Sequence, residues 1–530
     1  MLDLTYKKPN YQSIQPANYV YICRGVSFDQ DYANTILYPN ADAQYQAITA
    51  KKKYENEALS PISLSQPIRL PYVADELFDC NYLVFRNVNF TSKIFYAFIT
   101  DIIYVNPNSC QVNFKLDILQ TFMFDMVIGQ CFVEREHVSD DTIGKHIMDE
   151  GLQLTQYVAC DEQRANVNDE AGIRMLYTNL DGQYAENVYD RMYQGMWDYI
   201  VPIDDADKIT AVINSHSSTP DDIVSIQMIP YKFYNDKGNS KRLSFTYQKD
   251  FSDIDGYKPR NNKLFTYPYN FLYVDNSQGQ ARKYQFENWD GNPVFNLECA
   301  IRSGTAMTVY CIPAGKYEGW ELGEDISQTL TLSGYPMCAW VSDTFKAYAA
   351  QENSRYIANL TNSTISGVTS MAISGMSGNP LAIAAAGGRA MSGVVQDYIS
   401  YMATMQNAQL MPDKVHGNQG TSTLWSNNAM DFYFTRRCIK ADIAKSIDDY
   451  FTRYGYKVSK VKVPNLTSRA SFNYIKTKGA IVHGNLPWNI AEQIQGIFDN
   501  GITFWHGDYI GDFSRSNAIV GGAKDGETQT

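Results

Sequence analysis

The sequence predicts a β-rich fold, all-β to α+β, with antiparallel sheets, a long apolar insertion and a C-terminal helix-strand-helix region. The 530 residues include 39 Tyr and 25 Phe, which favour the half-buried surface of a pleated sheet, and 34 Gly and 19 Pro, which supply turns. A strong hairpin pattern lies near residue 100, and a long uncharged segment begins at residue 356. At roughly 100 to 200 residues per domain, the length predicts three or four structural units.

Residues 1–152 are expected to form an N-terminal β-rich domain. Two runs within it, 93–104 and 110–119, are rich in aromatic and β-branched residues and flank the turn sequence NPNS. The second run alternates apolar and polar residues. This pattern predicts a β-hairpin with one buried face.

Residues 153–350 are expected to form one or more further β-rich domains. Asp-Gly pairs at 181, 255 and 290 separate short Tyr-rich runs, which predicts antiparallel strands joined by tight turns. Pro268 interrupts the apolar run 264–275, so this run is expected to be an edge strand or to contain a bend.

Residues 351–427 form a segment of unusual composition. The part from 356 to 388 contains no Asp, Glu, Lys or Arg, and up to Pro412 only Arg389 and Asp397 are charged. Apolar residues mixed with Gly, Ala and Ser are typical of helices that pack closely in lipid, and also of a flexible linker. An apolar run of about 18 residues, the length of a membrane helix, is missing.

Residues 428–530 are expected to form an α+β region that packs back on the N-terminal domain. Apolar residues at helical spacing predict an amphipathic helix that ends at Gly455. A strand is expected over 470–482. A second helix should begin with Asn489 as N-cap and stop at Gly501.

The net charge of −12 argues against tight, sequence-specific nucleic-acid binding, which needs a basic surface. An acidic surface would suit a conduit through which DNA slides, or would serve solubility alone. The nine cysteines are widely spread without a C-x-x-C pair, so neither a disulfide framework nor a zinc site is expected. The N-terminal sequence lacks the pattern of a secretory signal, which favours synthesis in a reducing cytoplasm.

The common signatures of enzymes are missing from the sequence. It contains no P-loop, H-E-x-x-H, G-x-S-x-G or EF-hand pattern, and none of its six His pairs with another at i, i+4. Glu134 and Asp140 lie in a dense polar cluster that could supply the two carboxylates of a glycosidase. A solvated stretch of ion pairs is the alternative. We expect no catalytic residues, no cofactor and no metal site.

Seven short motifs occur in order at the two ends of the sequence. They are FYAFIT (95–100), FKLDILQTFMFD (114–125), FVEREHV (132–138), DEGL (149–152), YGYKVSKVKVPNL (454–466), FNYIKTK (472–478) and FDNGITFWH (498–506). The series resembles the tail knob, or major tail, proteins of short-tailed phages of the phi-29 type. Residues 153–348 are only loosely similar to that family.

The resemblance implies a virion protein of the phage tail, assembled in the host cytoplasm. Its antiparallel β-barrel or sandwich domains would form a homohexameric tube at the distal end of the tail. The implied partners are the tail tube or lower collar protein, the host membrane, and genomic double-stranded DNA that passes through the lumen without specific contacts. Family members carry apolar loops that plug the lumen and, on DNA ejection, help to open the membrane.

The resemblance places this apolar loop in the uncharged segment. Each apolar side chain buried in a bilayer contributes about 1.5 to 3 kcal/mol, and six copies would add up. The residues expected to be membrane-active are Ile365, Val368, Met371, Ile373, Met376, Leu381, Ile383, Met391, Val394 and Val395.

Three alternatives stay open. The segment could be a buried helix or a linker without a membrane role. The protein could be a tail enzyme that cleaves wall glycan with Glu134 and Asp140. It could also be an adhesin that binds a receptor through residues 153–348.

Overall fold

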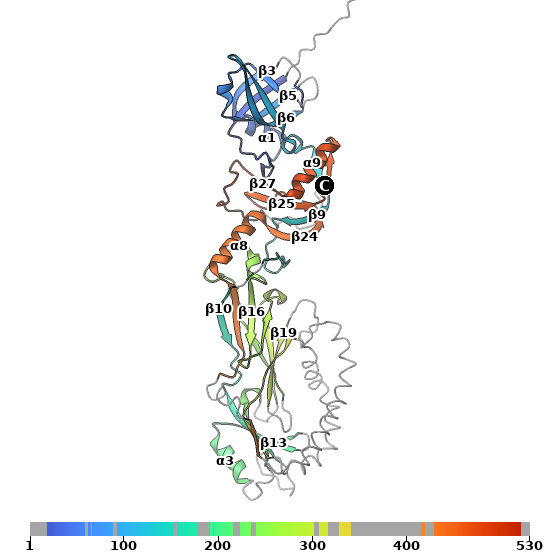
Figure 1. Ribbon diagram of the computed structural model, residues 1–530. Coiled ribbons are helices and arrows are strands. Elements are labelled where there is room, and N and C mark those ends of the chain that lie inside the picture. The colour runs from blue at the N-terminus through green and yellow to red at the C-terminus, as the bar shows by residue number, and fades with distance from the viewer. Residues whose placement is uncertain are drawn as a thin grey trace, which may run out of the picture. The chain divides into compact units, whose positions relative to one another are not determined.

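A computed structural model describes residues 18–58, 62–64, 66–87, 93–152, 154, 156–177, 191–193, 196–215, 223–234, 240–300, 307–315, 328–340, 415–418 and 429–520. The chain divides into two compact units. Unit 1 comprises Met1–Leu152 and Ser446–Thr530, and unit 2 comprises Gln153–Lys445. Antiparallel sheets dominate both units, which confirms the prediction of a β-rich fold (Figure 1).

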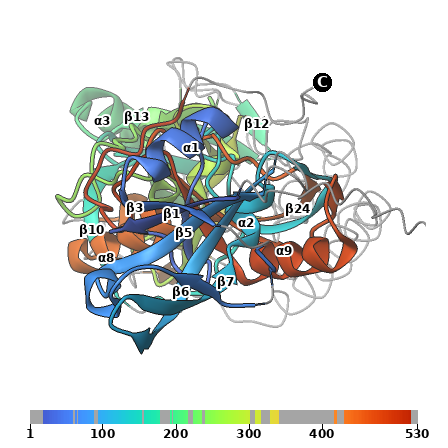
Figure 2. The ribbon, with the colours of Figure 1, turned by 90° about the horizontal axis from the view of Figure 1, so that it is seen from above.

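Unit 1 contains a six-stranded antiparallel sheet formed by the N-terminal part of the chain. Its strands, in their order across the sheet, are β3 (Lys52–Ala58), β1 (Asn18–Arg24), β5 (Cys80–Asn87), β6 (Ile94–Asn106), β7 (Ser109–Leu116) and β4 (Ile68–Leu70). Figure 2 shows β1, β5, β6 and β7 following one another across this sheet. The predicted hairpin is confirmed, because Asn106 of β6 pairs with Ser109 of β7.

Short helices complete this part of unit 1. They are α1 (Ala41–Thr49), the 3-10 turn η1 (Ala74–Leu77) and α2 (Ile118–Phe122). Asn40 caps α1 by accepting the Ala43 N–H, and Asp117 caps α2 by accepting the Gln120 N–H.

A five-stranded sheet in unit 1 combines strands from both ends of the sequence. Its order is β2 (Asn34–Ile36), β27 (Ile502–Trp505), β25 (Phe472–Lys478), β9 (Cys131–Glu136) and β24 (Tyr456–Lys462). Figure 1 shows β9 in teal among the orange β24 and β25. A two-stranded ribbon pairs β8 (Met126–Ile128) with β26 (Val482–Gly484).

Both predicted C-terminal helices are present. The first, α8 (Ala441–Tyr454), ends before Gly455, as its spacing predicts. The second, α9 (Trp488–Asn500), ends at Gly501, whose φ of 95° is favourable for glycine. Asn489 is not the N-cap, because Pro487 holds that position and the helix already includes Asn489.

The strand predicted over 470–482 is shorter than expected. β25 ends at Lys478, and Gly479, with a φ of 70°, turns the chain before β26 begins. The buried faces of α9 and the two large sheets of unit 1 share one core, which includes Val84, Phe98, Ile475 and Phe498. The N- and C-terminal segments therefore fold as one unit.

The described residues of unit 2 form three antiparallel sheets. One has the order β10 (Tyr157–Arg164), β23 (Tyr433–Ile439), β16 (Asn270–Asp275), β17 (Ala281–Tyr284). The second has the order β12 (Arg191–Tyr193), β13 (Met196–Pro202), β11 (Ala171–Tyr177), β14 (Ile223–Pro230), β21 (Met337–Trp340), β22 (Val415–Asn418). The third has the order β15 (Leu243–Thr246), β18 (Val294–Ala300), β19 (Thr308–Ala314), β20 (Leu330–Leu332).

Unit 2 has few helices among its described residues: α3 (Ala206–Ser215) and the 3-10 turns η3 (Tyr231–Phe233), η4 (Asn262–Phe265) and η5 (Phe286–Asn288). Pro268 lies in a turn before β16 begins, which agrees with the predicted bend, whereas the edge-strand alternative is wrong because β16 lies between β23 and β17. The core is rich in aromatic rings, such as Phe434 stacked on Phe245 at 4.3 Å between ring centres.

Candidate functional site: the centre of unit 1 and the base of unit 2

The ten residues expected to form a membrane-active loop all lie outside the described part of the chain. Their role stays a prediction. Within the described residues, no helix is both long and apolar enough to cross a bilayer. The candidate sites that the structure can describe therefore lie in the bodies of the two units.

The centre of unit 1 is built around the end of β9, where the two terminal segments meet. The Arg135 guanidinium donates to the Gly455 carbonyl oxygen at 2.7 Å and lies 4.8 Å from the Tyr450 ring centre. The same guanidinium forms an ion pair with Glu150. Glu150 also accepts the Lys457 N–H at 3.0 Å. One acidic side chain therefore binds both Arg135 and Lys457, which are more than 300 positions apart in the sequence.

Gly455 is required where α8 turns into β24. Its φ is 63°, and a Cβ placed there would lie 2.1 Å from the Glu136 carbonyl oxygen. Any larger residue would push β9 and β24 apart at this point. The glycine thus serves both the end of the helix and the close approach of the two strands.

His137 lies beside this turn and is 2% exposed. Its Nδ1 accepts the Tyr474 N–H at 2.8 Å, and its Nε2 lies 3.0 Å from the Thr452 carbonyl oxygen. Because a carbonyl can only accept, the proton is on Nε2. Burial, together with the charge of Arg469, lowers the pKa of His137 to about 3, so the ring is neutral.

The other polar groups around His137 are also satisfied. Ser468 Oγ donates to the His137 carbonyl oxygen, and Arg469 Nε donates to the Val138 carbonyl oxygen. Buried Glu136 pairs with Lys462 at 2.6 Å. A centre with such fixed partners is suited to holding segments together rather than to moving protons.

A second buried polar group lies in the N-terminal part of unit 1. Asp117, 1% exposed, accepts the Gln120 N–H at 3.0 Å and the Tyr82 hydroxyl at 2.8 Å. Burial raises the pKa of this carboxyl to about 6. Gln120 in turn donates to Thr35 Oγ1 and accepts from Gln44, so this network ties β2 and α1 to α2.

Both carboxylates of the proposed glycosidase pair form ion pairs with lysines. Glu134 pairs with Lys476 at 3.2 Å on the surface. Lys145 and the Thr142 hydroxyl hold the pKa of Asp140 below its usual range. A general acid needs a raised pKa, which Asp140 does not have, and the lysine partners of both groups favour the interpretation as surface ion pairs. In the described residues, no cluster of His, Cys, Asp and Glu could hold a metal ion.

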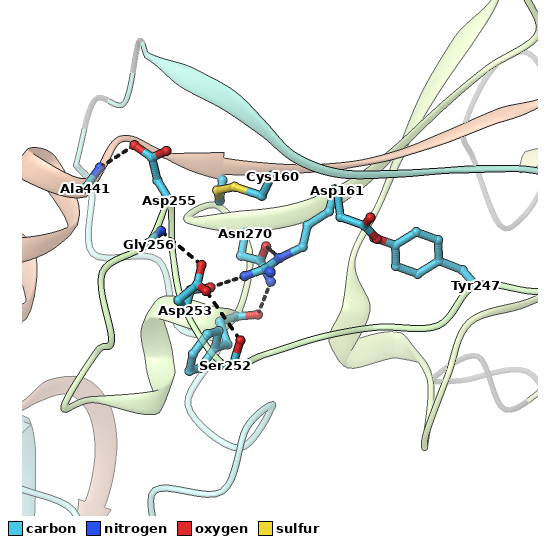
Figure 3. Close-up of a disulfide and its surroundings, with 12 residues drawn as sticks. Cys160, Asp161, Tyr247, Ser252, Asp253, Asp255, Gly256, Asn270 and Ala441 are labelled. Atoms are coloured by element: carbon cyan, nitrogen blue, oxygen red, sulfur yellow. Dashed lines mark hydrogen bonds between the residues drawn. A yellow bond between two sulfur atoms is a disulfide. The ribbon is translucent and has the colours of Figure 1, made fainter.

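In unit 2, a disulfide joins Cys160 of β10 to Cys438 of β23 (Figure 3). This bond departs from the expectation that the widely spread cysteines form no disulfide framework, because strand pairing brings together two cysteines that are 278 residues apart. The strands are neighbours in the sheet, where Val158 pairs with Cys438. Cys160 lies at the register shift between Ala159 and Asp161, with its Cα 6.4 Å from that of Cys438. The disulfide closes the base of unit 2, where the chain enters and leaves it.

The surroundings of the disulfide are polar and well connected (Figure 3). Buried Arg436 donates through Nε to Asn270 at 3.0 Å and through a terminal nitrogen to the Asp253 carbonyl oxygen. Tyr247 donates to Asp161 at 2.8 Å, and Asp255 accepts the Ala441 N–H at 3.0 Å. These contacts fix the loop 250–256 against β16 and β23.

Comparisons with known proteins give a consistent picture. The family model described as the C-terminal domain of tail knob protein gp9 of Bacillus phage phi29 matches residues 231–518. The model described as the N-terminus of caudoviral major tail proteins matches residues 12–127. Tail knob protein gp9 of phi29 is 25% identical, and that of Bacillus phage B103 is 26% identical, each over 94% of this chain and 98% of the relative.

A solved structure supports the same fold. The tail knob protein gp12 of bacteriophage C1 superimposes with a TM-score of 0.62 over 95% of this chain and all of that protein, at 13% identity.

Proposed function

Because this chain belongs to the tail knob protein family of phi29-like phages and is a structural component of the virion tail, we propose that it forms a homohexameric tube at the distal end of the tail. One observation carries this proposal. All seven motifs that resemble the family, although they lie at opposite ends of the sequence, fall in unit 1. Unit 1 is therefore the part expected to form the tube wall.

The tube would bind the tail tube or lower collar protein at one end and conduct genomic DNA through its lumen. Six identical copies can close a ring through one repeated head-to-tail contact. The net charge of −12 supports a conduit through which DNA passes without tight binding.

We also propose that the chain beyond residue 152 is divided into three functional parts, 153–350, 351–427 and 428–530. The segment 351–427 would plug the lumen before infection. On ejection its apolar residues, from Ile365 to Val395, would enter the host membrane, as their uncharged composition suggests.

A dye-release assay on liposomes over a range of pH tests the membrane role. One variant replaces residues 364–396 with a Gly/Ser linker, and a matched control replaces residues 521–530 in the same way. Leakage caused by the native protein and the control, and lost in the first variant, is the expected result. Leakage from none of the three, in a hexameric preparation, would contradict the membrane role.

The protein would act without catalysis. The ion pair of Glu134 with Lys476 supports this part of the proposal. Purified host cell wall should release no reducing ends when incubated with the protein. Release that disappears in Glu134→Gln would show that the protein is a wall-degrading enzyme.

A further inference from the structure

The negative charge of the chain is distributed unevenly. Residues 450–491 contain no Asp or Glu but carry seven cations, although the chain as a whole has a net charge of −12. These cations are Arg453, Lys457, Lys460, Lys462, Arg469, Lys476 and Lys478. A local excess of cations of this size indicates a positively charged surface on a chain whose net charge is negative.

Strand register places several of these cations on one face of the five-stranded sheet. Lys476 of β25, Arg135 of β9 and Lys457 of β24 pair in one row across the strands. Two residues further along β25, and past a register shift in each pairing, Lys478 pairs with Phe132 of β9, which pairs with Val461 of β24.

The position of α9 identifies the other face. Thr477 lies between the two lysines of β25 and donates to Asp499 of α9 at 2.7 Å. Because successive side chains in a strand alternate, Lys476 and Lys478 point away from α9. We call the face formed by Lys457, Lys476, Lys478, Arg135, Phe132 and Val461 the basic face.

The described acidic groups neutralise this face only in part. Glu150 pairs with Arg135, which is largely buried, and Glu134 pairs with Lys476 at 3.2 Å, where both side chains are over one third exposed. Lys478 is exposed, as are the neighbouring Phe132, at 38%, and Val461, at 70%. The outer end of the basic face is thus positively charged and accessible in a single chain.

We propose that the basic face binds the phosphate backbone of duplex DNA. The inference rests on the proposed function, which brings this one polyanion past every copy of the chain. Lysines offer point charges to phosphates without reading sequence. Because each copy supplies only about three such contacts, binding should be weak and sensitive to salt, which permits sliding.

Fluorescence anisotropy with a labelled duplex of about 30 base pairs tests the proposal on the full-length protein, at salt concentrations from about 25 to 200 mM. The test variant is Lys457→Glu with Lys478→Glu. The control, Lys241→Glu with Lys445→Glu, changes the net charge equally at exposed lysines of unit 2.

The test variant should lose about tenfold or more in affinity at low salt, and its log–log salt slope should fall by about two, one for each phosphate contact. The control should stay within about twofold of the native protein. The single variant Lys478→Gln, at an exposed position, should lose less in the same direction even if the double variant folds poorly. Thermal unfolding reports folding for each protein.

Absence of DNA binding by the native protein at low salt, or equal losses in the test and control variants, would overturn the proposal. Tighter binding of poly(glycerol phosphate) than of DNA of equal charge would also overturn it and assign the face to a wall polymer. Native mass spectrometry on the same samples separates this result from the proposed function, because a hexamer that ignores DNA contradicts only the inference.

Discussion

Both units must connect chain segments that are hundreds of residues apart, and they do so by different chemistry. In unit 1, hydrogen bonds and ion pairs around Arg135 and His137 hold β9 to segments more than 300 residues away. In unit 2, the disulfide Cys160–Cys438 joins the first and last strands of the base, 278 residues apart. The first kind of connection depends on protonation states, and the second depends on the redox environment.

This difference suggests where each unit is sensitive. Unit 1 buries a neutral imidazole and a carboxyl of raised pKa, so its stability should change with pH. The connection at the base of unit 2 should instead respond to reductant. A tail protein that is made in a reducing cytoplasm and acts outside the cell would meet both changes.

The largest effect is expected at the turn between α8 and β24. Gly455→Ala should destabilise unit 1 by about 4 kcal/mol, because the new Cβ overlaps the Glu136 carbonyl and the φ of 63° is unfavourable for alanine. Hydrogen exchange of the β25 amides at increasing denaturant concentration would measure this loss of stability. Gly479→Ala is the control: its φ is 70°, with no atom within 4 Å of the Cβ, so it should cost about 1 kcal/mol. Equal losses of stability in the two variants would contradict the importance of the close approach between Gly455 and the Glu136 carbonyl.

Breaking the disulfide should have the next largest effect. Cys160→Ser should lower the stability of unit 2 by about 3 kcal/mol, because the bond closes a long loop. Scanning calorimetry with and without reductant would measure it: reductant should lower the unit 2 transition of the native protein and leave the variant unchanged. A unit 1 transition that shifts as much as that of unit 2 would contradict the comparison.

Acid should weaken unit 1 through His137. The folded pKa of about 3 lies below the usual value of 6.5, so only the unfolded chain takes up a proton as the pH falls through 6.5. At pH 5 this linkage removes about 2 kcal/mol relative to pH 8. Hydrogen exchange at the Tyr474 amide would follow it. In His137→Gln the protein should be less stable at pH 8 but lose this part of the pH dependence, and an unchanged slope would contradict the assignment.

Asp117 should give the smallest effect, with the opposite sign. Its folded pKa of about 6 lies above the usual value of 3.8, so the folded state holds the proton longer and loses stability as the pH rises from about 4 to 6. Asp117→Asn keeps an acceptor for the Gln120 N–H and removes this loss of stability. The free energy of unfolding of the variant should therefore be about 1 kcal/mol higher than that of the native protein at pH 8. Unfolding curves at pH 4, 6 and 8 would show a flatter profile, and a profile as steep as that of the native protein would refute the account.

Local patterns in the sequence predicted the local structure well. The hairpin of β6 and β7 and the helix α8 were predicted because their periodicity lies within short windows. The predicted N-cap of α9 was wrong, since the N-cap is Pro487, two residues before Asn489. Boundaries depend on single residues and are harder to predict than the elements themselves.

The buried centres could not be predicted in the same way. Cys160 and Cys438 become neighbours only through the pairing of β10 with β23. Asp117 did leave a signal, because an acidic residue followed three positions later by Gln120 is a capping pattern. His137 gave none, since its neutral state follows from burial by segments distant in sequence.

Native mass spectrometry of the full-length protein, combined with electron microscopy of the same sample, tests the central claim most directly. The account predicts a particle with the mass of six chains and a ring-shaped end view. A monomer or dimer at micromolar concentration, with unit 1 folded as judged by protected β25 amides, would contradict a tube formed by this protein alone.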